Sequence, residues 1–188
     1  MSKKISIALV LFFLLTLNVF ASSGVVFSDL DYDDPSEEAI INLQESSVVD
    51  GYPDGTFKSL NKINRAEFLK IVVGSVFDEA EGANCFSDVK DEWFAKYVCF
   101  AKEQNIVDGY SDGTFKPADN INFAEASKII SKAFGLAETE DSEIWYKNFV
   151  EAIAEKNAIP FSISDLDKKI YRGEMAELVW RLKEDITD

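Results

Sequence analysis

The 188-residue sequence contains no histidine, and this absence limits the chemistry that the chain can perform. Histidine is the usual general base near neutral pH and a common zinc ligand. The sequence also has no serine in a nucleophile-elbow motif. Acid pairs of the kind that glycoside hydrolases use are abundant, but they recur at expected turns and helix starts, which is a structural use of acids. We therefore expect no catalysis and no cofactor.

Positive charge is the second shortage, because 19 lysines and arginines stand against 34 aspartates and glutamates. Nucleic acids and anionic membrane surfaces require a basic face, so the net charge of −15 argues against both partners. The acidic stretch DLDYDD at 29–34 suggests a calcium site. An EF-hand loop, however, needs a glycine at its sixth position and an acid at its twelfth, and counted from Asp29 these positions hold Asp34 and Ile40. We expect no metal site, with specific calcium binding as the alternative to weak condensation of cations.

The first 21 residues have the pattern of a cleaved secretory signal peptide. Lys3 and Lys4 precede an apolar run over 5–20, and Val19-Phe20-Ala21 is suited to signal peptidase. The alternative is a membrane anchor, but about 15 apolar residues fall short of the about 20 that span a bilayer. Removing the two lysines of this leader leaves 17 basic residues (19 − 2) against 34 acidic ones, a charge of −17. We expect a secreted protein that makes no membrane contact after cleavage.

Cysteine is limited to Cys85 and Cys99. In a secreted chain an even number of cysteines predicts a disulfide, whereas two cysteines without histidine make a poor zinc site. The bond would join the segment before Phe86 to a helix that contains Cys99. Closing a loop of about 15 residues adds about 3 kcal/mol of stability. The alternative is a pair of buried free thiols.

The chain also contains an internal repeat. GYPDGTF at 51–57 recurs as GYSDGTF at 109–115, FSDL at 27–30 as FSDV at 86–89, and INRAE at 63–67 as INFAE at 121–125. A third, divergent copy keeps IYRGE at 170–174 and a helix-like run at 149–159, but residues 160–169 replace the GYxDGTF loop. The predicted units are residues 22–83, 84–137 and 138–188, after the signal peptide at 1–21.

Each unit is predicted to fold as a helix, a structured loop and a second helix. Residues 93–104 show helical spacing of their apolar side chains. Asn64 and Asn122 stand at N-cap positions, with Glu67 and Glu125 three residues on, as in a capping box. The buried face of the helix after Asn64 is expected to include Phe68, Leu69, Val72, Val73 and Val76. Pro53-Asp54-Gly55 predicts a turn between the packing residues Tyr52 and Phe57.

These motifs, in this order and in units of 50 to 60 residues, resemble the S-layer homology domain family. The resemblance covers about residues 27–184, although the third unit matches mainly through its helices and IYRGE. It implies a mainly α fold of three helix–loop–helix repeats in a pseudo-threefold arrangement. It also implies noncovalent attachment to bacterial cell-wall polysaccharide, typically a pyruvylated secondary polymer linked to peptidoglycan, at the cell surface.

In that family the arginine of the INRAE-like motif binds the acidic sugar, in grooves between neighbouring repeats. Arg65 and Arg172 stand at this position, in the expected first turn of a helix, where backbone N–H groups favour an anion. A guanidinium can hold a pyruvate carboxylate through two hydrogen bonds. The alternative is that both arginines pair with acids of the protein itself. Phe123 replaces the arginine in the second unit, so we expect at most two competent grooves.

Further glycan contacts are predicted with their structural alternatives. Asp29 and Asp88 are expected either to accept hydrogen bonds from sugar hydroxyls or to cap the following helix. Trp93 and Trp145 are expected either to stack on sugars or to enter the core, and Pro35 falls roughly at their position in the first unit. Gly51 and Gly109 would let a ligand approach the backbone. Glu67, Glu125 and Glu174 are expected to cap helices rather than bind ligand.

A protein–protein function is the competing interpretation. The third unit is divergent, and little of the sequence lies outside the three units. The alternative to glycan binding is therefore an adaptor for an envelope protein, or a surface protein that assembles with itself.

Overall fold

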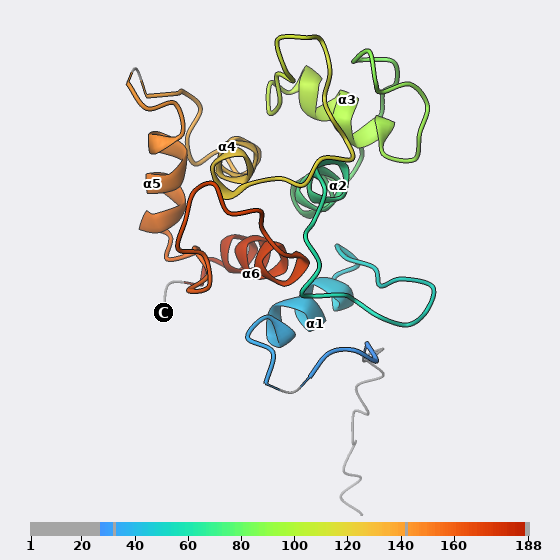
Figure 1. The fold of residues 1–188 in the computed structure, drawn as a ribbon, viewed down its shortest axis with the longest axis vertical. Coiled ribbons are helices and arrows are strands. Elements are labelled where there is room, and N and C mark those ends of the chain that lie inside the picture. The colour runs from blue at the N-terminus through green and yellow to red at the C-terminus, as the bar shows by residue number, and fades with distance from the viewer. Residues whose placement is uncertain (1–26, 32, 142, 187–188) are drawn as a thin grey trace, which may run out of the picture.

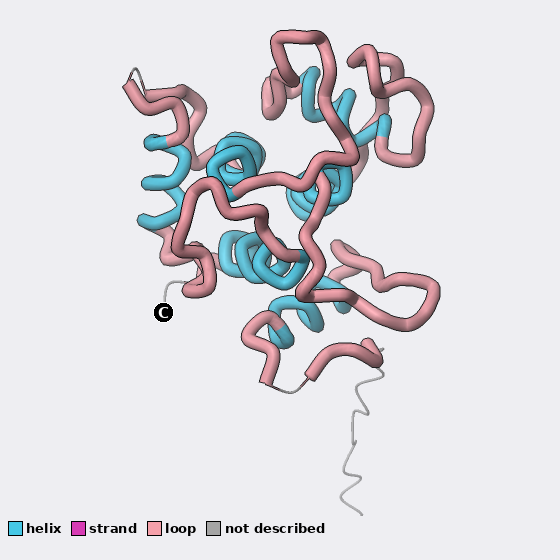
Figure 2. Tube along the Cα trace, in the orientation of Figure 1, coloured by secondary structure: helices cyan, strands magenta, loops and turns pink. Residues whose placement is uncertain are grey.

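The computed structural model describes residues 27–31, 33–141 and 143–186. The predicted signal peptide, residues 1–21, lies outside these ranges. The described chain forms six α-helices (Figures 1 and 2), and its remaining pairing consists of isolated β-bridges. The helices are α1 (Glu37–Glu45), α2 (Arg65–Val76), α3 (Ala95–Glu103), α4 (Phe123–Ala133), α5 (Lys147–Glu155) and α6 (Arg172–Lys183). The fold is therefore mainly α, as predicted.

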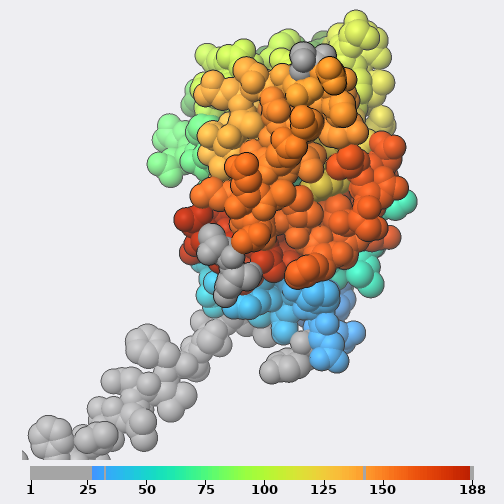
Figure 3. All heavy atoms as spheres, turned by 90° about the vertical axis from the view of Figure 1, so that its left-hand side faces the viewer, coloured from blue at the N-terminus to red at the C-terminus, as the bar shows by residue number. Residues whose placement is uncertain are grey.

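The helices form three pairs, α1/α2, α3/α4 and α5/α6, each joined by a loop. In Figure 1 the second helices of the pairs, α2, α4 and α6, occupy the centre, and α1, α3 and α5 surround them. Each outer helix packs on the inner helix of the preceding pair: α3 on α2, α5 on α4, and α1 on α6. No pair therefore buries its own apolar faces, and the three pairs depend on one another for a core. Residues of α5 and the loop after it form most of the face in Figure 3.

A closed ring of backbone hydrogen bonds lies where the three inner helices begin. The N–H of Ile63 donates to the carbonyl of Ile170 at 3.1 Å, Ile170 donates to Ile121 at 3.2 Å, and Ile121 donates to Ile63 at 3.2 Å. All three side chains are fully buried. Such a ring is what the predicted pseudo-threefold arrangement requires, although symmetry of the whole molecule stays a prediction.

The helix starts are capped as the sequence predicts, except that the side chain of Glu67 makes no capping hydrogen bond and instead faces Arg172. The side chain of Asn64 accepts the N–H of Glu67 at 2.8 Å, and Asn122 accepts the N–H of Glu125 at the same distance. Glu125 completes its capping box by accepting the N–H of Asn122 at 3.1 Å, and Glu174 accepts the N–H of Tyr171 at 2.9 Å. Such caps contribute about 1 kcal/mol each.

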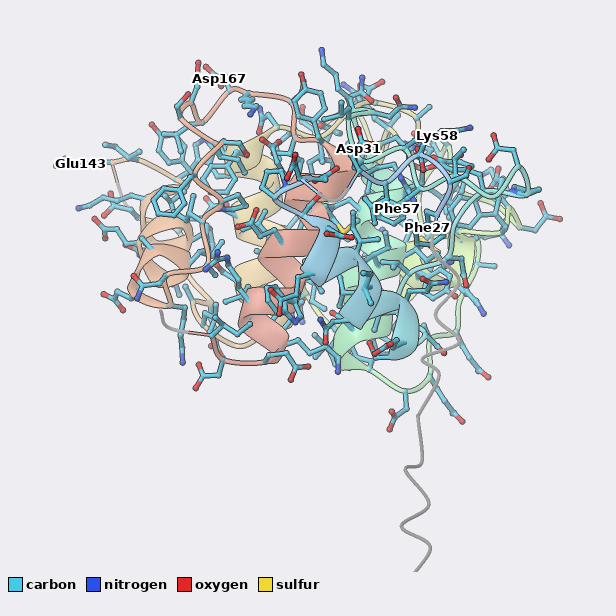
Figure 4. The ribbon with its side chains drawn as sticks, turned by 90° about the horizontal axis from the view of Figure 1, so that it is seen from below. Phe27, Asp31, Phe57, Lys58, Glu143 and Asp167 are labelled. Carbon is cyan, nitrogen blue, oxygen red and sulfur yellow. A yellow bond between two sulfur atoms is a disulfide. The ribbon has the colours of Figure 1, made fainter. Side chains whose placement is uncertain are left out.

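The GYPDGTF loop is a turn clamped by an upstream aspartate. Asp54 accepts the N–H of Thr56 at 3.1 Å, and Gly55 has the expected positive φ of 81°. The two carboxylate oxygens of Asp29 accept the N–H groups of Phe57 and Lys58 at 2.7 and 2.8 Å. The rings of Phe27 and Phe57 lie together beside this clamp, with centroids 5.3 Å apart (Figure 4).

Asp88 repeats this clamp in the second pair. It accepts the N–H groups of Phe115 and Lys116, both at 2.8 Å. The helix-capping alternative for Asp29 and Asp88 is therefore wrong, because the N-cap residues of α1 and α3 are Ser36 and Phe94. These aspartates bind a loop that lies 27 to 29 residues downstream, a contact that local sequence cannot reveal.

The predicted core is confirmed with one exception. Phe68, Leu69, Val72 and Val73 are fully buried, whereas Val76, at the end of α2, keeps 38% of its surface exposed. The Cys85–Cys99 disulfide is also present, and it joins the segment before Phe86 to α3. Among the described residues, no helix combines the length and apolar character that crossing a bilayer demands.

Removing the disulfide should destabilise the protein. The bond closes a loop with a sequence separation of 14, so Cys85→Ala/Cys99→Ala should lower the free energy of unfolding by about 3 kcal/mol. Urea denaturation of the oxidised protein measures this loss, with the reduced wild type as control. Two free thiols by nonreducing mass analysis, or unchanged stability, would contradict the assignment.

Removing the clamp should also lower stability. Asp88→Ala leaves two backbone N–H groups without their charged acceptor, which should cost about 3 kcal/mol in chemical denaturation. The matched control is Asp91→Ala, because Asp91 is exposed and nearby. A stability equal to that of the control would show that Asp88 has no structural role.

Candidate functional site

Two grooves on the surface are built from corresponding residues. The Arg65 groove encloses about 210 Å³ and is lined by residues that include Asp108, Gly109, Tyr110, Glu125, Lys128 and Trp145. The Arg172 groove encloses about 140 Å³ and is lined by Asp50, Gly51, Tyr52, Glu67, Lys70, Ile71, Trp93 and Arg172. Six of these positions recur with the 58-residue spacing of the repeat. Each groove combines one pair's loop and inner helix, the arginine of the preceding pair and the tryptophan of the following pair.

Both arginines are held in the same way. The Nε of Arg65 donates to the carbonyl of Phe115 at 3.0 Å, and the Nε of Arg172 donates to the carbonyl of Phe57 at 2.9 Å. Each guanidinium also lies 4.7 to 4.9 Å from the centroids of a tyrosine ring and a phenylalanine ring of the GYxDGTF loop. The arginines are only 6% and 5% exposed, so the guanidinium plane is fixed before any ligand arrives.

The terminal nitrogens of both arginines face a carboxylate of the protein. Arg65 Nη1 lies 3.5 Å from Glu125, and Arg172 Nη1 lies 3.8 Å from Glu67. The alternative that the arginines pair with protein acids is therefore part of the observed geometry. These distances are longer than charge-assisted hydrogen bonds, which are about 2.7 to 2.9 Å, so the terminal nitrogens retain donor capacity.

The helix N-termini themselves are not open to an anion. The N–H groups of Arg65 and Ala66 donate to the carbonyls of Asp119 and Pro117, and that of Glu67 to its cap. Arg172 and Gly173 donate likewise to Asn61 and Ser59. The expectation that first-turn N–H groups would bind an anion is therefore wrong for these residues. Any anion must be held by side chains, because the helix starts use these donors to join neighbouring pairs.

Several ionisable groups of the Arg65 groove are joined by hydrogen bonds that shift their pKa values. A hydrogen bond from Lys128 lowers the pKa of Asp108. Burial lowers the pKa of Lys128, but hydrogen bonds to Glu140 and Asp108 outweigh it and leave that pKa raised. Burial and a hydrogen bond to Glu125 raise the pKa of Tyr110 to about 12. At neutral pH the groove therefore contains paired charges and a protonated phenol.

Both tryptophans lie at the groove edges rather than in the core. Trp93 is 58% exposed and Trp145 is 40% exposed, so the alternative that they are core residues is wrong. Each ring rests edge-on against the next aromatic residue, Phe94 or Tyr146, which limits its rotation. The exposed faces can receive an apolar surface such as a sugar ring.

The two glycines have a packing reason of their own. A Cβ on Gly51 would overlap Phe27 Cε1, and one on Gly109 would overlap Phe86 Cε1. Gly109 also has a φ of 76°. Both glycines line their grooves, so the predicted approach of a ligand to the backbone stays a prediction beside this structural requirement.

The joint that corresponds to the two arginine grooves in the third unit has a different set of side chains. Its arginine position is occupied by the buried Phe123, its loop by residues 160–169 and its tryptophan position by Pro35. Glu177 replaces Lys70 and Lys128 of the other two grooves. A pocket of about 400 Å³ here is lined by several carboxylates, with Lys168 as its one lysine. Departures of the first unit (Pro35) and the third unit (Ser162, Lys168 and Glu177) line this pocket, and the N–H of Phe123 donates to the carbonyl of Lys168.

A lysine replaces the missing arginine as partner of the capping glutamate. Lys168 Nζ lies 2.5 Å from Glu174, and Ser162 donates to the same oxygen at 2.6 Å, much as Tyr110 does to Glu125 at 2.8 Å. The lysine comes from the loop of the third pair, not from the preceding inner helix. This pocket keeps an internal ion pair but has no guanidinium to offer an anion.

Several groove residues were not predicted from the sequence. Tyr52, Tyr110, Lys70, Lys128 and Lys168 were missed as site residues, although the first four repeat at the 58-residue spacing. That shared spacing was the available signal. Among the described residues, no three His, Cys, Asp or Glu side chains lie close enough together to hold a metal ion, although several carboxylates line the third pocket.

Comparisons with known proteins agree with this architecture. The S-layer homology domain model matches residues 26–69 and 86–127. The middle cell wall protein of Brevibacillus brevis is 31% identical over 78% of this chain and 14% of its own length. The surface-layer 125 kDa protein of Lysinibacillus sphaericus is 32% identical over 66% of this chain and 11% of its length.

The cellulosome-anchoring protein of Acetivibrio thermocellus is 29% identical over 60% of this chain and 26% of its own length. The chain thus spans between 11% and 26% of these three relatives. The family model does not cover the third helix pair, whose assignment as a divergent repeat stays a prediction. Each of the two segments that match the S-layer homology domain model contains an outer helix, a GYxDGTF loop and the start of an inner helix.

Proposed function

We propose that the protein is a noncatalytic module of the cell surface that attaches noncovalently to anionic, pyruvylated cell-wall polysaccharide. The two arginine grooves are the binding sites, and the secondary polymer linked to peptidoglycan is the partner. The observation that carries this proposal is the identical presentation of Arg65 and Arg172, each clamped between two rings at the edge of a groove.

The geometry supports a saccharide that carries a carboxylate. The guanidinium end provides charged donors, and an exposed tryptophan lines each groove as a platform for the sugar ring. Asp29 and Asp88 hold the loop that supports the guanidinium, and any hydroxyl contact they make would use their remaining lone pairs. Each groove is small, so a polymer that engages both gains from a high effective concentration at the second.

The names of these relatives point in the same direction. They are a cell wall protein, a surface-layer protein and a cellulosome-anchoring protein, in which sequences similar to this chain form a minor part. A role in attachment suits a segment that recurs in proteins with these names. Carried over to this chain, that role needs no reacting group, only a surface that holds the polymer.

An adaptor or self-assembly function is the second candidate. It is favoured by the side chains of Leu60 and Phe161, which are 79% and 101% exposed on the loops of the first and third pairs. Leu60 and Ser162 also line the acidic third pocket. Exposed apolar side chains next to a pocket are typical of protein contacts. This function would use the third pocket instead of the two grooves.

Binding to purified cell-wall sacculi should require both arginines. Arg65→Gln/Arg172→Gln should weaken saturable binding by about 100-fold, because each lost charge-assisted hydrogen bond costs about 1.5 to 3 kcal/mol. Chemical removal of pyruvyl groups from the sacculi should also weaken binding of the wild type. A sedimentation assay measures both.

The control is Arg181→Gln, because Arg181 pairs with Glu177 outside the two grooves. Since the groove arginines are buried, Trp93→Ala/Trp145→Ala provides a second test at exposed positions and should also weaken binding. Wild-type affinity in both double variants, with folding verified by circular dichroism, would exclude the glycan proposal and favour the adaptor.

A further inference from the structure

The two grooves differ in how firmly the internal carboxylate beside each arginine is held. In the Arg65 groove, one oxygen of Glu125 accepts the hydroxyl of Tyr110 at 2.8 Å, and the other accepts the N–H of Asn122 at 3.1 Å. Lys169 lies 3.8 Å from the second oxygen. Glu125 is therefore fixed beside Arg65 by bonds that do not involve the arginine.

Glu67, its counterpart in the Arg172 groove, has much less support. Within the described chain, its side chain makes the 3.8 Å ion pair with Arg172 and no hydrogen bond. Tyr52, at the position of Tyr110, makes no bond to it. Glu67 can therefore rotate away from the guanidinium at the cost of one long ion pair.

The second cation of each groove follows the same trend. Lys128 contacts two carboxylates, those of Asp108 at 3.0 Å and Glu140 at 2.6 Å. Lys70 contacts one, that of Asp50 at 3.2 Å, and the Asp50 side chain is 78% exposed. The charge of Lys70 is thus less neutralised by the protein and is more available to an incoming anion.

A bound carboxylate must share the guanidinium with this internal glutamate. Two carboxylates within about 4 to 6 Å repel each other, and the repulsion persists where the internal one is unable to move. In the Arg172 groove, Glu67 can rotate away and leave the guanidinium to the ligand. In the Arg65 groove, Glu125 stays, and its charge opposes an acidic ligand but not an uncharged one.

We propose that the two grooves select sugars of different charge. The Arg172 groove takes the acidic sugar, and the Arg65 groove takes an uncharged sugar of the same polymer, with Glu125 and Tyr110 as the selecting pair. This inference rests on the proposed glycan binding and adds a division of labour between the grooves. It predicts a polymer bound with a defined orientation, because its acidic and neutral units enter different sites.

The two tryptophans make the grooves separately observable. Trp93 lines the Arg172 groove and Trp145 the Arg65 groove, so their indole N–H signals in a ¹H–¹⁵N spectrum report on one groove each. The signals are assigned with Trp93→Phe and Trp145→Phe. The acidic probe is the methyl glycoside of a hexose with a 4,6-linked pyruvate ketal, and the uncharged probe is its methyl ester.

The acidic probe should shift Trp93 at a concentration about tenfold lower than Trp145, the equivalent of one hydrogen bond to a charged group. The methyl ester should reduce this difference to about twofold or less. Glu125→Gln, which keeps an amide at the helix cap, should bring the midpoint of Trp145 within about twofold of Trp93. The matched variant Glu67→Gln should change the Trp93 midpoint by less than about threefold.

The proposal is overturned if Trp145 responds to the acidic probe at an equal or lower concentration than Trp93. It is also overturned if Glu125→Gln leaves the tenfold difference intact. If neither indole signal shifts with either probe while sacculi still bind the wild type, groove selection is rejected but binding to the wall is retained. If neither indole signal shifts and the wild type does not bind sacculi, the proposed function itself is rejected.

Discussion

The ring of backbone hydrogen bonds between Ile63, Ile121 and Ile170 is the constraint on which the structure depends. It joins the three inner helix starts, and the next two N–H groups of each helix donate to a loop of the following pair. The start of each inner helix is thus tied to its neighbour's loop. Both arginine grooves lie at such joints, so the same bonds that close the fold place each guanidinium between two aromatic rings.

The interlocked packing explains why departures from the repeat gather at one joint. Phe123 stands where the preceding inner helix would supply an arginine. The loop at 160–169 has no tyrosine to clamp one, and its single phenylalanine, Phe161, is fully exposed. Pro35 and Glu177 complete the change at the same pocket. A guanidinium buried at this joint without its clamp would be costly, so the loss of the arginine and the loss of the loop are physically linked. The other two grooves remain intact because they share none of these residues.

Features that depend on residues close in sequence were predicted correctly, whereas contacts between distant segments were not. The caps at Asn64 and Asn122, the turn at 53–55 and the disulfide each depend on residues close in sequence, and the structure confirms them. The clamp by Asp29 and Asp88 escaped prediction because its partners come from a distant loop. The sequence left the exposure of Trp93 and Trp145 as one of two alternatives, since helical spacing alone does not separate a core face from a groove edge.

The sequence by itself determined the helix–loop–helix unit, because periodicity, capping and turn chemistry act over a few residues, and its resemblance to the S-layer homology domain family singled out the mainly α class and the two candidate arginines. Only the tertiary structure decided which residues share a groove. Arg65 faces Tyr110 and Trp145, and Arg172 faces Tyr52 and Trp93, so neither arginine meets the loop of its own pair. The physical reason is that no pair buries its own faces: each must pack on a neighbour, and every site is therefore assembled from several pairs.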